Sequence, residues 1–276
     1  MIPFPSIDPV IFSIGPLHVR WYGLMYVLGF SASYLLVKKQ VARFKFKELE
    51  EHFEDLNLIL ILCVILGGRL GYVLFYNLPY YLAHPLEIPA TWNGGMSIHG
   101  AAICLVFGGG LFCRRKKINF WKAADVYIVT MPIGIGLGRI GNFINGELFG
   151  RTTTVPWGMI FPGGGPSPRH PSQLYEAFLE GLVLFLILWP LKNRPWQRRP
   201  LWPHGSMLAL FFICYGIFRI LVEFVRQPDP QVGFLFGLFT MGQLLSCVMI
   251  LAGLLLWWVR KINIIESDNL PSSDHL

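Results

Sequence analysis

Two arginines, two asparagines and a glutamate interrupt an apolar stretch near the middle of the chain. They are Arg139, Asn142, Asn145, Glu147 and Arg151, in the run GRIGNFINGELFGR at residues 138–151. An unpaired charge in an apolar segment costs several kcal/mol, so such residues face a bundle interior or a wet cavity and serve a function there. Glycines among them let a neighbouring helix or a ligand approach the backbone. We interpret this run as the centre of an active site at a membrane surface.

Arginines and tyrosines share helix faces in two other apolar segments. The two sets are Arg69, Tyr72 and Tyr76 at i, i+3, i+7 spacing, and Tyr215, Arg219, Glu223 and Arg226 at i, i+4, i+8, i+11 spacing. Glu223 is placed to orient Arg219 through an i,i+4 pair, or the two form only a structural ion pair. Because Arg69, Arg139 and Arg219 exceed what nearby carboxylates need, we favour phosphate as their partner. A phosphate suits the planar fork of a guanidinium.

A histidine and a tyrosine are further candidates. His99 lies in the run GMSIHG, residues 95–100, where a loop enters an apolar segment. It is either a hydrogen-bonded structural residue or a general base. The nearby Ser97 hints at a serine hydrolase, but no GxSxG run or third partner accompanies it. Tyr22 belongs either to an interfacial aromatic belt or to the site.

The run RHPSQLYE, residues 169–176, leads into another apolar segment. Ser172 is placed to cap this helix, with Glu176 close to the capping-box position. A purely structural role and a functional role are both open for this run. Glu180 lies one turn further on the same face, and we interpret it as a packing or pairing carboxylate.

Several kinds of chemistry lack their motifs in this chain. There is no His, Cys and Asp cluster with metal-ligand spacing, no Walker A loop and no nucleotide-binding glycine fingerprint. We therefore predict no metal and no cofactor, so that any phosphate chemistry depends on arginines. The five cysteines lie in apolar segments without CxxC spacing, and we expect them to be packing residues.

The composition predicts a membrane protein. Hydrophobic residues make up 54% of the 276 residues and charged residues 14%, against about 25% charged in ordinary soluble domains. Apolar runs of roughly 20 residues, enough to cross a bilayer as helix, recur along the chain. We predict an all-α, polytopic fold with about seven transmembrane helices, at 17–37, 57–76, 98–113, 121–142, 173–191, 205–225 and 236–258.

Basic residues predict the orientation of these segments. All nine lysines lie beside the odd-numbered gaps between them, whereas the opposite side carries arginines only. By the positive-inside rule the N-terminus lies outside and the C-terminus lies in the cytoplasm. The net charge of +7 is then an orientation signal and an attraction to anionic lipid. It does not indicate a nucleic-acid partner.

The chain reads as one integral membrane domain, 1–276, with a membrane core at 17–261 and a flexible cytoplasmic tail at 262–276. The mixed-charge segment 38–55 predicts a helical cytoplasmic loop. The loops at 77–97 and 143–172 lie outside, and the glycines and prolines of the second predict a small irregular periplasmic head. No internal repeat is evident, which weakens the case for a transporter built from inverted halves.

The run from Gly138 to Gly150 resembles, along its whole length, the signature of the prolipoprotein diacylglyceryl transferase family. Other stretches match motifs of that family in the right order: His99-Gly100, His170 to Glu176, Tyr215…Arg219…Glu223, and Arg226 to Asp229. The resemblance extends from about Tyr22 to Asp229. Its main departure is that Met96 and Ser97 precede Ile98, where variation is acceptable.

The resemblance implies transfer of an sn-1,2-diacylglyceryl group from phosphatidylglycerol to the lipobox cysteine thiol of a prolipoprotein signal peptide, in the bacterial inner membrane. A thioether forms and glycerol 1-phosphate leaves. The resemblance assigns the lipid headgroup to Arg139 and Arg219, and the role of base to His99. Supporting and substrate-binding roles fall to Glu147, Glu223, Tyr22, Asn142 and Gly150. Asn145, Arg69, Tyr76 and Tyr215 complete the predicted substrate-binding set.

Two questions stay open at this level. The thiol proton is taken by His99, by Glu147 or by the substrate itself. A transporter or channel for an anionic solute, with arginines lining a pathway, is a rival class of function. Against it, the charged residues gather near the outer ends of the segments and do not continue to the cytoplasmic side.

Overall fold

The computed structural model describes residues 2–5, 7–15, 17–91, 94–197, 202–227, 234–235 and 239–268. These residues are mostly helical and form two compact units. Unit 1 comprises Met1–Val37 and Ala124–Leu276, and unit 2 comprises Lys38–Ala123. Helices α1 (Trp21–Phe44) and α6 (Phe120–Ile128) run across the unit boundaries.

Unit 2 is built from helices. They are α2 (Lys47–Glu50), α3 (Phe53–Tyr76), α4 (Leu78–Ala83), the short 3-10 turn η1 (Pro85–Glu87) and α5 (Ile98–Arg115). Glycines let α3 and α5 pack closely, since a Cβ on Gly71 would lie 2.6 Å from the Cα of Gly100. Gly67 and Gly71 present small residues at four-residue spacing, a common device of helix packing in membranes.

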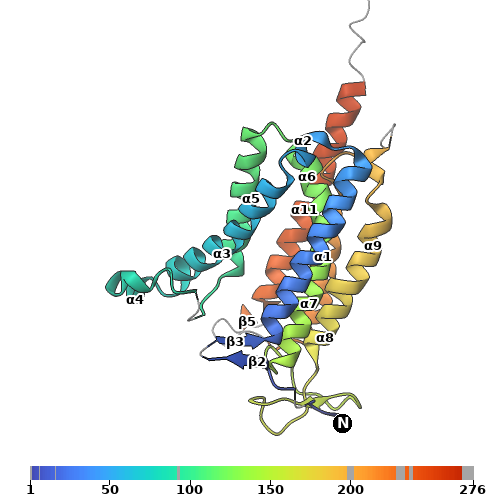
Figure 1. The fold of residues 1–276 in the computed structure, drawn as a ribbon. Helices are drawn as coiled ribbons and strands as arrows, with labels where there is room; N and C mark the ends of the chain where they lie inside the picture. The colour runs from blue at the N-terminus through green and yellow to red at the C-terminus, as the bar shows by residue number, and fades with distance from the viewer. Residues whose placement is uncertain are drawn as a thin grey trace, which may run out of the picture. The chain divides into compact units, whose positions relative to one another are not determined.

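Unit 1 contains a helical bundle and short strands. Its elements are β1 (Ile2–Pro3), β2 (Val10–Ile14), β3 (Leu17–Arg20), α7 (Met131–Ile144), β4 (Met159–Ile160), α8 (Ser172–Glu176), the π-helical η3 (Ala177–Val183), α9 (Leu184–Leu191), η4 (Arg194–Trp196), α10 (Ser206–Glu223), β5 (Phe234–Leu235), β6 (Phe239–Thr240) and α11 (Met241–Asp268). The segments α8, η3 and α9 continue one another as a single rod. Helix α7 runs alongside this rod (Figure 1), and α10 packs along α11.

Two glycines let α7 cross the rod closely. A Cβ built on Gly181 in η3 would lie 2.7 Å from the Cα of Gly136 in α7, closer than side chains tolerate. Beyond this crossing, a cluster of buried apolar side chains forms the core of unit 1. Its members are Val129, Leu184, Leu188, Met207 and Phe211. The crossing and the core together fix α7, the rod and α10 against one another.

Both ends of the α10–α11 pair have identifiable caps. The carboxylate of Asp125, from α6, accepts hydrogen bonds from the N–H groups of Gly205 and Met207 at 2.8 and 3.0 Å. These are orphan donors at the start of α10, which a carboxylate satisfies well. At the start of α11, Thr240 and Gln243 exchange side-chain and backbone hydrogen bonds as a capping box.

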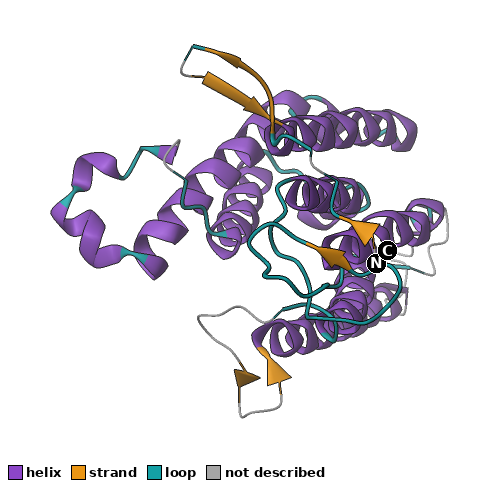
Figure 2. Ribbon diagram, turned by 90° about the horizontal axis from the view of Figure 1, so that it is seen from below, coloured by secondary structure: helices purple, strands orange, loops and turns teal. Residues whose placement is uncertain are grey.

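Loops lie across the ends of the unit 1 helices, as seen from below in Figure 2. Strand β1 pairs in parallel with β4 in this region, while β2 and β3 form an antiparallel hairpin. The long connection 145–171 is held by isolated bridges, such as Thr152 with Arg169. This connection coincides with the predicted irregular head.

Within the described residues, helices occupy most of each of the seven segments predicted from hydropathy, with α6 and α7 sharing the fourth. Most of segment 38–55 is helical, as predicted. Within the described residues, four helices are long and apolar enough to cross a membrane, or five if the bent pair α6–α7 is one span. The four are Phe53–Tyr76, Ser172–Trp196, Ser206–Glu223 and Met241–Ile262. The mostly helical, multi-pass character therefore agrees with the prediction.

Two stretches differ from what the pattern predicted. Residues 17–20 form strand β3, so α1 begins only at Trp21. These four residues alternate apolar and polar side chains, as in a strand, but four residues are too few for a period to distinguish a strand from a helix. At the other end, α11 continues to Asp268, through the first part of the stretch 262–276 predicted as a tail. Residues 269–276 lie outside the described residues.

We expect Gly181→Ala to lower the free energy of unfolding by about 1–3 kcal/mol, because the added methyl group collides with the backbone of α7. Gly138→Ala, in α7 itself, is the matched control, since a Cβ there meets nothing within 4 Å. Thermal unfolding of the detergent-solubilised protein measures both. Equal melting temperatures for the two variants would contradict the close crossing.

Candidate active site

Three arginines and three glutamates gather in unit 1, and we call this set the charge cluster. Its members are Arg139 on α7, Glu176 on α8, Glu180 on η3, Arg219 and Glu223 on α10, and Arg226 just after α10. No helix supplies more than two of the six. The cluster therefore exists only when α7, the rod and α10 pack together.

Glu176 lies at the centre of the cluster and is fully buried. Its Oε2 atom is 2.6 Å from Nε of Arg139 and 3.3 Å from Nη1 of Arg219. Its Oε1 atom accepts a hydrogen bond of 2.9 Å from Nη1 of Arg226. Arg139 and Arg219, which are 80 positions apart in the sequence, thus converge on one carboxylate oxygen.

The other two glutamates differ in how closely they pair with the arginines. Glu223 Oε2 lies 3.1 Å from Nη2 of Arg219, which confirms the predicted i,i+4 pair. Glu180 pairs with Arg139 and Arg219, as predicted for a pairing carboxylate, but at 3.7 Å in each case. Within the described residues, neither oxygen of Glu180 accepts a hydrogen bond.

The cluster is balanced in charge, with three carboxylates for three guanidinium groups. The predicted excess of arginine is therefore wrong for Arg139 and Arg219, because the sequence left the role of Glu176 open and did not place Glu176 and Glu180 beside these arginines. Exposure is uneven: the side chains of Arg139 and Arg219 are 19% and 14% exposed, whereas those of Glu176 and Glu180 are 0% exposed. The guanidinium groups of Arg139 and Arg219 therefore lie closer to the protein surface than the carboxylates of Glu176 and Glu180. Among the described residues, Nη1 of Arg219 makes no hydrogen bond, although it is buried.

The close helix crossing explains how the cluster forms. Arg139 follows Gly136 by nearly one turn on α7, and Glu180 directly precedes Gly181 in the rod. Both charged residues therefore lie next to the close contact between the two backbones. The rod is π-helical at this point, and such stretches are frequent at functional sites. Tyr215 lies one turn before Arg219 and stacks on Phe211, with ring centroids 5.5 Å apart.

A second polar group lies at the end of α7. The amide groups of Asn142 and Asn145 both donate to Oε1 of Glu147, at 2.9 and 3.0 Å. The backbone carbonyl of Glu147 in turn accepts from Nε2 of Gln173, at 2.6 Å. Because Asn142 follows Arg139 by one turn, this group adjoins the charge cluster. Glu147 is exposed, and its carboxylate is held by two amides.

Tyr22 joins this second group from α1. Its ring lies against Gly141, where a Cβ would come within 2.8 Å of the ring carbon Cδ2. Its hydroxyl group is 3.0 Å from that of Tyr26. The glycine in the run that the sequence singled out thus makes room for an aromatic ring of the same chain.

Gly150 is threaded between two backbone segments. Its N–H donates to the carbonyl of His170 at 2.8 Å, and it bridges Arg226. A Cβ at Gly150 would lie 2.5 Å from the carbonyl oxygen of Val225. Any side chain would therefore displace the chain just after α10, where Arg226 joins the charge cluster. The geometry gives Gly150 a positioning role.

The sequence reasoning did not assign roles to two arginines of the head, which hold its loops. Arg151 donates to the carbonyl of Arg226 at 2.9 Å, and Arg169 donates to the carbonyl of Gly164 at 2.7 Å. Next to Arg169, partial burial lowers the pKa of His170 below its usual range, so this imidazole stays neutral at neutral pH. In place of the predicted cap, Ser172 donates to the carbonyl of Leu148 at 3.1 Å.

Unit 2 contains the remaining predicted site residues, Arg69, Tyr76 and His99. The side chain of Arg69 is buried and donates to backbone carbonyl groups of Glu87, Ile88 and Gly94, at 2.8, 2.7 and 2.6 Å. It thereby holds the loop that follows η1. Tyr76 is 55% exposed, and its ring stacks on Tyr72 with centroids 5.7 Å apart.

His99 lies exposed in the first turn of α5. Ser97 is the N-cap of this helix, and its hydroxyl group accepts a hydrogen bond of 3.2 Å from the N–H of Gly100. Ser97 is also 97% buried, since only 3% of its surface is exposed. A capping role therefore accounts for Ser97 without nucleophilic chemistry.

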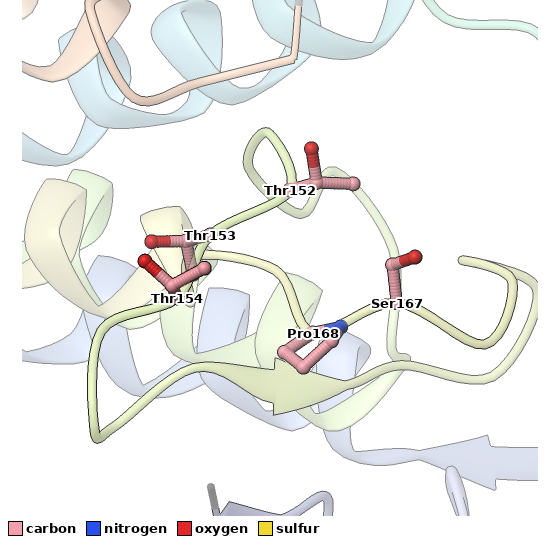
Figure 3. Close-up of a pocket in the computed structure, with 5 residues that line it drawn as sticks. All are labelled: Thr152, Thr153, Thr154, Ser167 and Pro168. Atoms are coloured by element: carbon pink, nitrogen blue, oxygen red, sulfur yellow. The ribbon is translucent and has the colours of Figure 1, made fainter.

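Two hollows lie in the head of unit 1. One, of about 460 Å³, is lined by hydroxyl groups and a proline, as Figure 3 shows, from Thr152, Thr153, Thr154, Ser167 and Pro168. The other, of about 800 Å³, is largely apolar and extends from the N-terminal segment to Ile144 and Asn145 at the end of α7. Neither is lined by a member of the charge cluster.

Known proteins resemble this chain over nearly its full length. The family model described as prolipoprotein diacylglyceryl transferase matches residues 9–259. A protein of Desulfotalea psychrophila named phosphatidylglycerol–prolipoprotein diacylglyceryl transferase is 66% identical, over 93% of this chain and 94% of its own. Proteins of the same name from Geobacter sulfurreducens and Pseudomonas aeruginosa are 55% and 48% identical, over 91% and 95% of this chain and 94% and 97% of theirs. The chain is thus a transferase that belongs to the prolipoprotein diacylglyceryl transferase family.

Proposed function

We propose that this protein transfers the sn-1,2-diacylglyceryl group of phosphatidylglycerol to the lipobox cysteine thiol of prolipoprotein signal peptides. A carbon–sulfur bond forms, the bond between that carbon and the phosphate oxygen breaks, and glycerol 1-phosphate leaves. This reaction is the first step of bacterial lipoprotein maturation. The names of the relatives, which mention both substrates, support it.

The observation that carries the proposal is the convergence of Arg139 and Arg219 on one oxygen of Glu176, at 2.6 and 3.3 Å. Two guanidinium groups so close together, nearer the surface than the buried carboxylates, form a site for an anion that both groups coordinate. The Nη1 atom of Arg219 forms an ion pair with Glu176 but makes no hydrogen bond within the described residues, so it is available to such an anion. A phosphodiester headgroup has the required charge and oxygen geometry.

The main requirement of the reaction is stabilisation of the leaving group. Because the thiolate attacks carbon, phosphorus needs no activated nucleophile, and charge builds up on the departing phosphate oxygen. Preorganised donors in a site shielded from water stabilise such charge far better than water does, by about 3–4 kcal/mol per donor in comparable sites. Arg139 and Arg219 take this role in the proposal, while Asn142, Asn145, Tyr22 and Tyr215 shape the binding site around them.

The thiol must also lose its proton. A free cysteine thiol has a pKa of about 8.5, so only a few per cent is thiolate at neutral pH. His99 is our first candidate for the base, and Glu147, held by two amide groups, is the second. Deprotonation by the substrate itself is the third route.

The proposal includes an arrangement in the membrane. Seven spans place the N-terminus outside and the C-terminus in the cytoplasm, as the lysines indicate. The head 145–171 and the charge cluster then lie toward the periplasmic side of the inner membrane. Phosphatidylglycerol reaches the cluster from the bilayer, and Arg69, which holds its own loop, supports the outer surface of unit 2.

Incubation of the purified protein with phosphatidylglycerol and a signal peptide carrying a lipobox cysteine tests the reaction. We expect the peptide to gain the mass of one diacylglyceryl group in a thioether, with one glycerol phosphate released per peptide. The same peptide with serine in place of cysteine is the control. Release of free fatty acid or peptide cleavage would indicate a hydrolase, and absence of any product would contradict the proposal.

Arg139→Lys should lower kcat/KM by about 10²–10³, because a point charge cannot make the two-pronged contact that a guanidinium makes. Arg226→Lys is the matched control, since it also loses a contact to Glu176 but has no assigned contact with the headgroup. Initial rates of peptide modification, together with melting temperatures, separate the two effects. Equal activity losses in both variants would remove the argument for a phosphate clamp.

His99→Gln should lower kcat by about 10²–10⁴ if the imidazole is the base. Binding of the lipid should change little, because the headgroup contacts are assigned to arginines of unit 1. Steady-state rates over a range of lipid concentrations provide kcat and KM separately. A parallel loss of lipid affinity and turnover would instead assign His99 a structural role.

A further inference from the structure

The balance of charge in the cluster changes when an anion binds. Without a ligand, three guanidinium groups offset three carboxylates. A phosphodiester brings one negative charge that no member of the cluster offsets. Glu176 and Glu180 are fully buried, and an uncompensated charge in such surroundings is strongly destabilising.

The arginines that receive the headgroup are also the partners of Glu180. Glu180 faces Arg139 on α7 and Glu176 on α8. On α10 it faces Arg219 and Tyr215. Arg226 also acts on it electrostatically, from beyond α10. When the guanidinium groups turn to the phosphate, Glu180 has a like charge on its own rod and weakened partners on the other helices.

Glu180 is also the least well bound of the three carboxylates. Its ion pairs are 3.7 Å long, whereas Glu176 has a pair at 2.6 Å and Glu223 one at 3.1 Å. Neither of its oxygens accepts a hydrogen bond within the described residues, although both are buried. A carboxylate in this state loses little when it is protonated, because it gives up no hydrogen bond.

We propose that Glu180 takes up one proton from solvent when the anionic headgroup binds, so that the charge cluster keeps its neutrality. This inference rests on the proposed function, since it takes a phosphodiester as the ligand of Arg139 and Arg219. The proton returns to solvent when glycerol phosphate leaves and the ion pairs form again. Glu180 is thus a positioning residue, which acts on the substrate only through the arginines.

Linkage gives the sign of the effect. A group that is protonated in the complex and ionised in the free protein makes binding strongest at low pH. Binding weakens as pH rises through the range in which the complex still holds the proton and the free protein has lost it. In that range the dissociation constant rises by up to about tenfold per pH unit. The phosphodiester itself does not titrate near neutral pH, so the dependence belongs to the protein.

The test uses the full-length protein in detergent with short-chain phosphatidylglycerol, dihexanoyl phosphatidylglycerol, and no peptide. We expect the wild-type protein to bind more weakly as pH rises and to take up about one proton per lipid, measured with a pH indicator in weak buffer. Glu180→Gln should abolish both the pH dependence and the proton uptake while it still binds the lipid. Glu180→Asp should restore them.

Glu147→Gln is the matched control, because it removes an equal charge beside the cluster, where two amide groups hold the carboxylate, and leaves the charge balance of the cluster itself unchanged. We expect it to retain the wild-type pH dependence. If Glu180→Gln does not fold, proton uptake by the wild-type protein and the behaviour of Glu147→Gln still decide the matter.

Wild-type binding that is independent of pH, or an unchanged pH dependence in Glu180→Gln, would overturn the proposal. Loss of the dependence in Glu147→Gln would move the proton to that residue and overturn it as well. The outcome is distinct from a failure of the proposed function. A protein that modifies the peptide without proton uptake retains the function and refutes only the role of Glu180, whereas a protein that neither binds the lipid nor modifies the peptide refutes both.

Discussion

The shared carboxylate of Glu176 is the interaction on which the rest of the site depends. It is fully buried and meets guanidinium groups from α7, from α10 and from the segment after α10. A buried carboxylate is stable only with such partners, and buried guanidinium groups need it equally. The three segments therefore have one register in which all charges are paired. The glycines at the crossing of α7 and the rod make that register sterically possible.

Glycines in the run 138–151 act mainly through steric effects. Gly141 receives the ring of Tyr22, and Gly150 passes between the backbones at His170 and Val225. Both let polar side chains of the chain come into place through close backbone packing. The run 138–151 thus combines two kinds of residue. Charged and amide groups pair with one another, and glycines let neighbouring side chains and backbone segments approach closely.

The sequence predicted the mostly helical, multi-pass character well, because hydropathy reports burial or lipid contact directly. It also predicted the Arg219–Glu223 pair, whose spacing is local. It did not predict that Arg139 meets Glu176 and Glu180, because that contact depends on how two helices cross, which no spacing within one helix reveals. The expected surplus of arginine was wrong for the same reason. The β2–β3 hairpin was missed because the four residues Leu17–Arg20, which alternate apolar and polar side chains, are too few to establish a period.

The order in which the charges appear along the chain has a consequence for biogenesis. Arg139 leaves the ribosome well before Glu176, and Arg219 follows later. In the proposed multi-pass arrangement, a nascent α7 segment carries its guanidinium group into a hydrocarbon environment with no counter-ion, at a cost of about 2.5–3.5 kcal/mol in translocon insertion. Integration of α7 is therefore expected to wait at the translocon until the rod arrives, so that assembly of the ion pairs and partitioning into the lipid occur as one cooperative event.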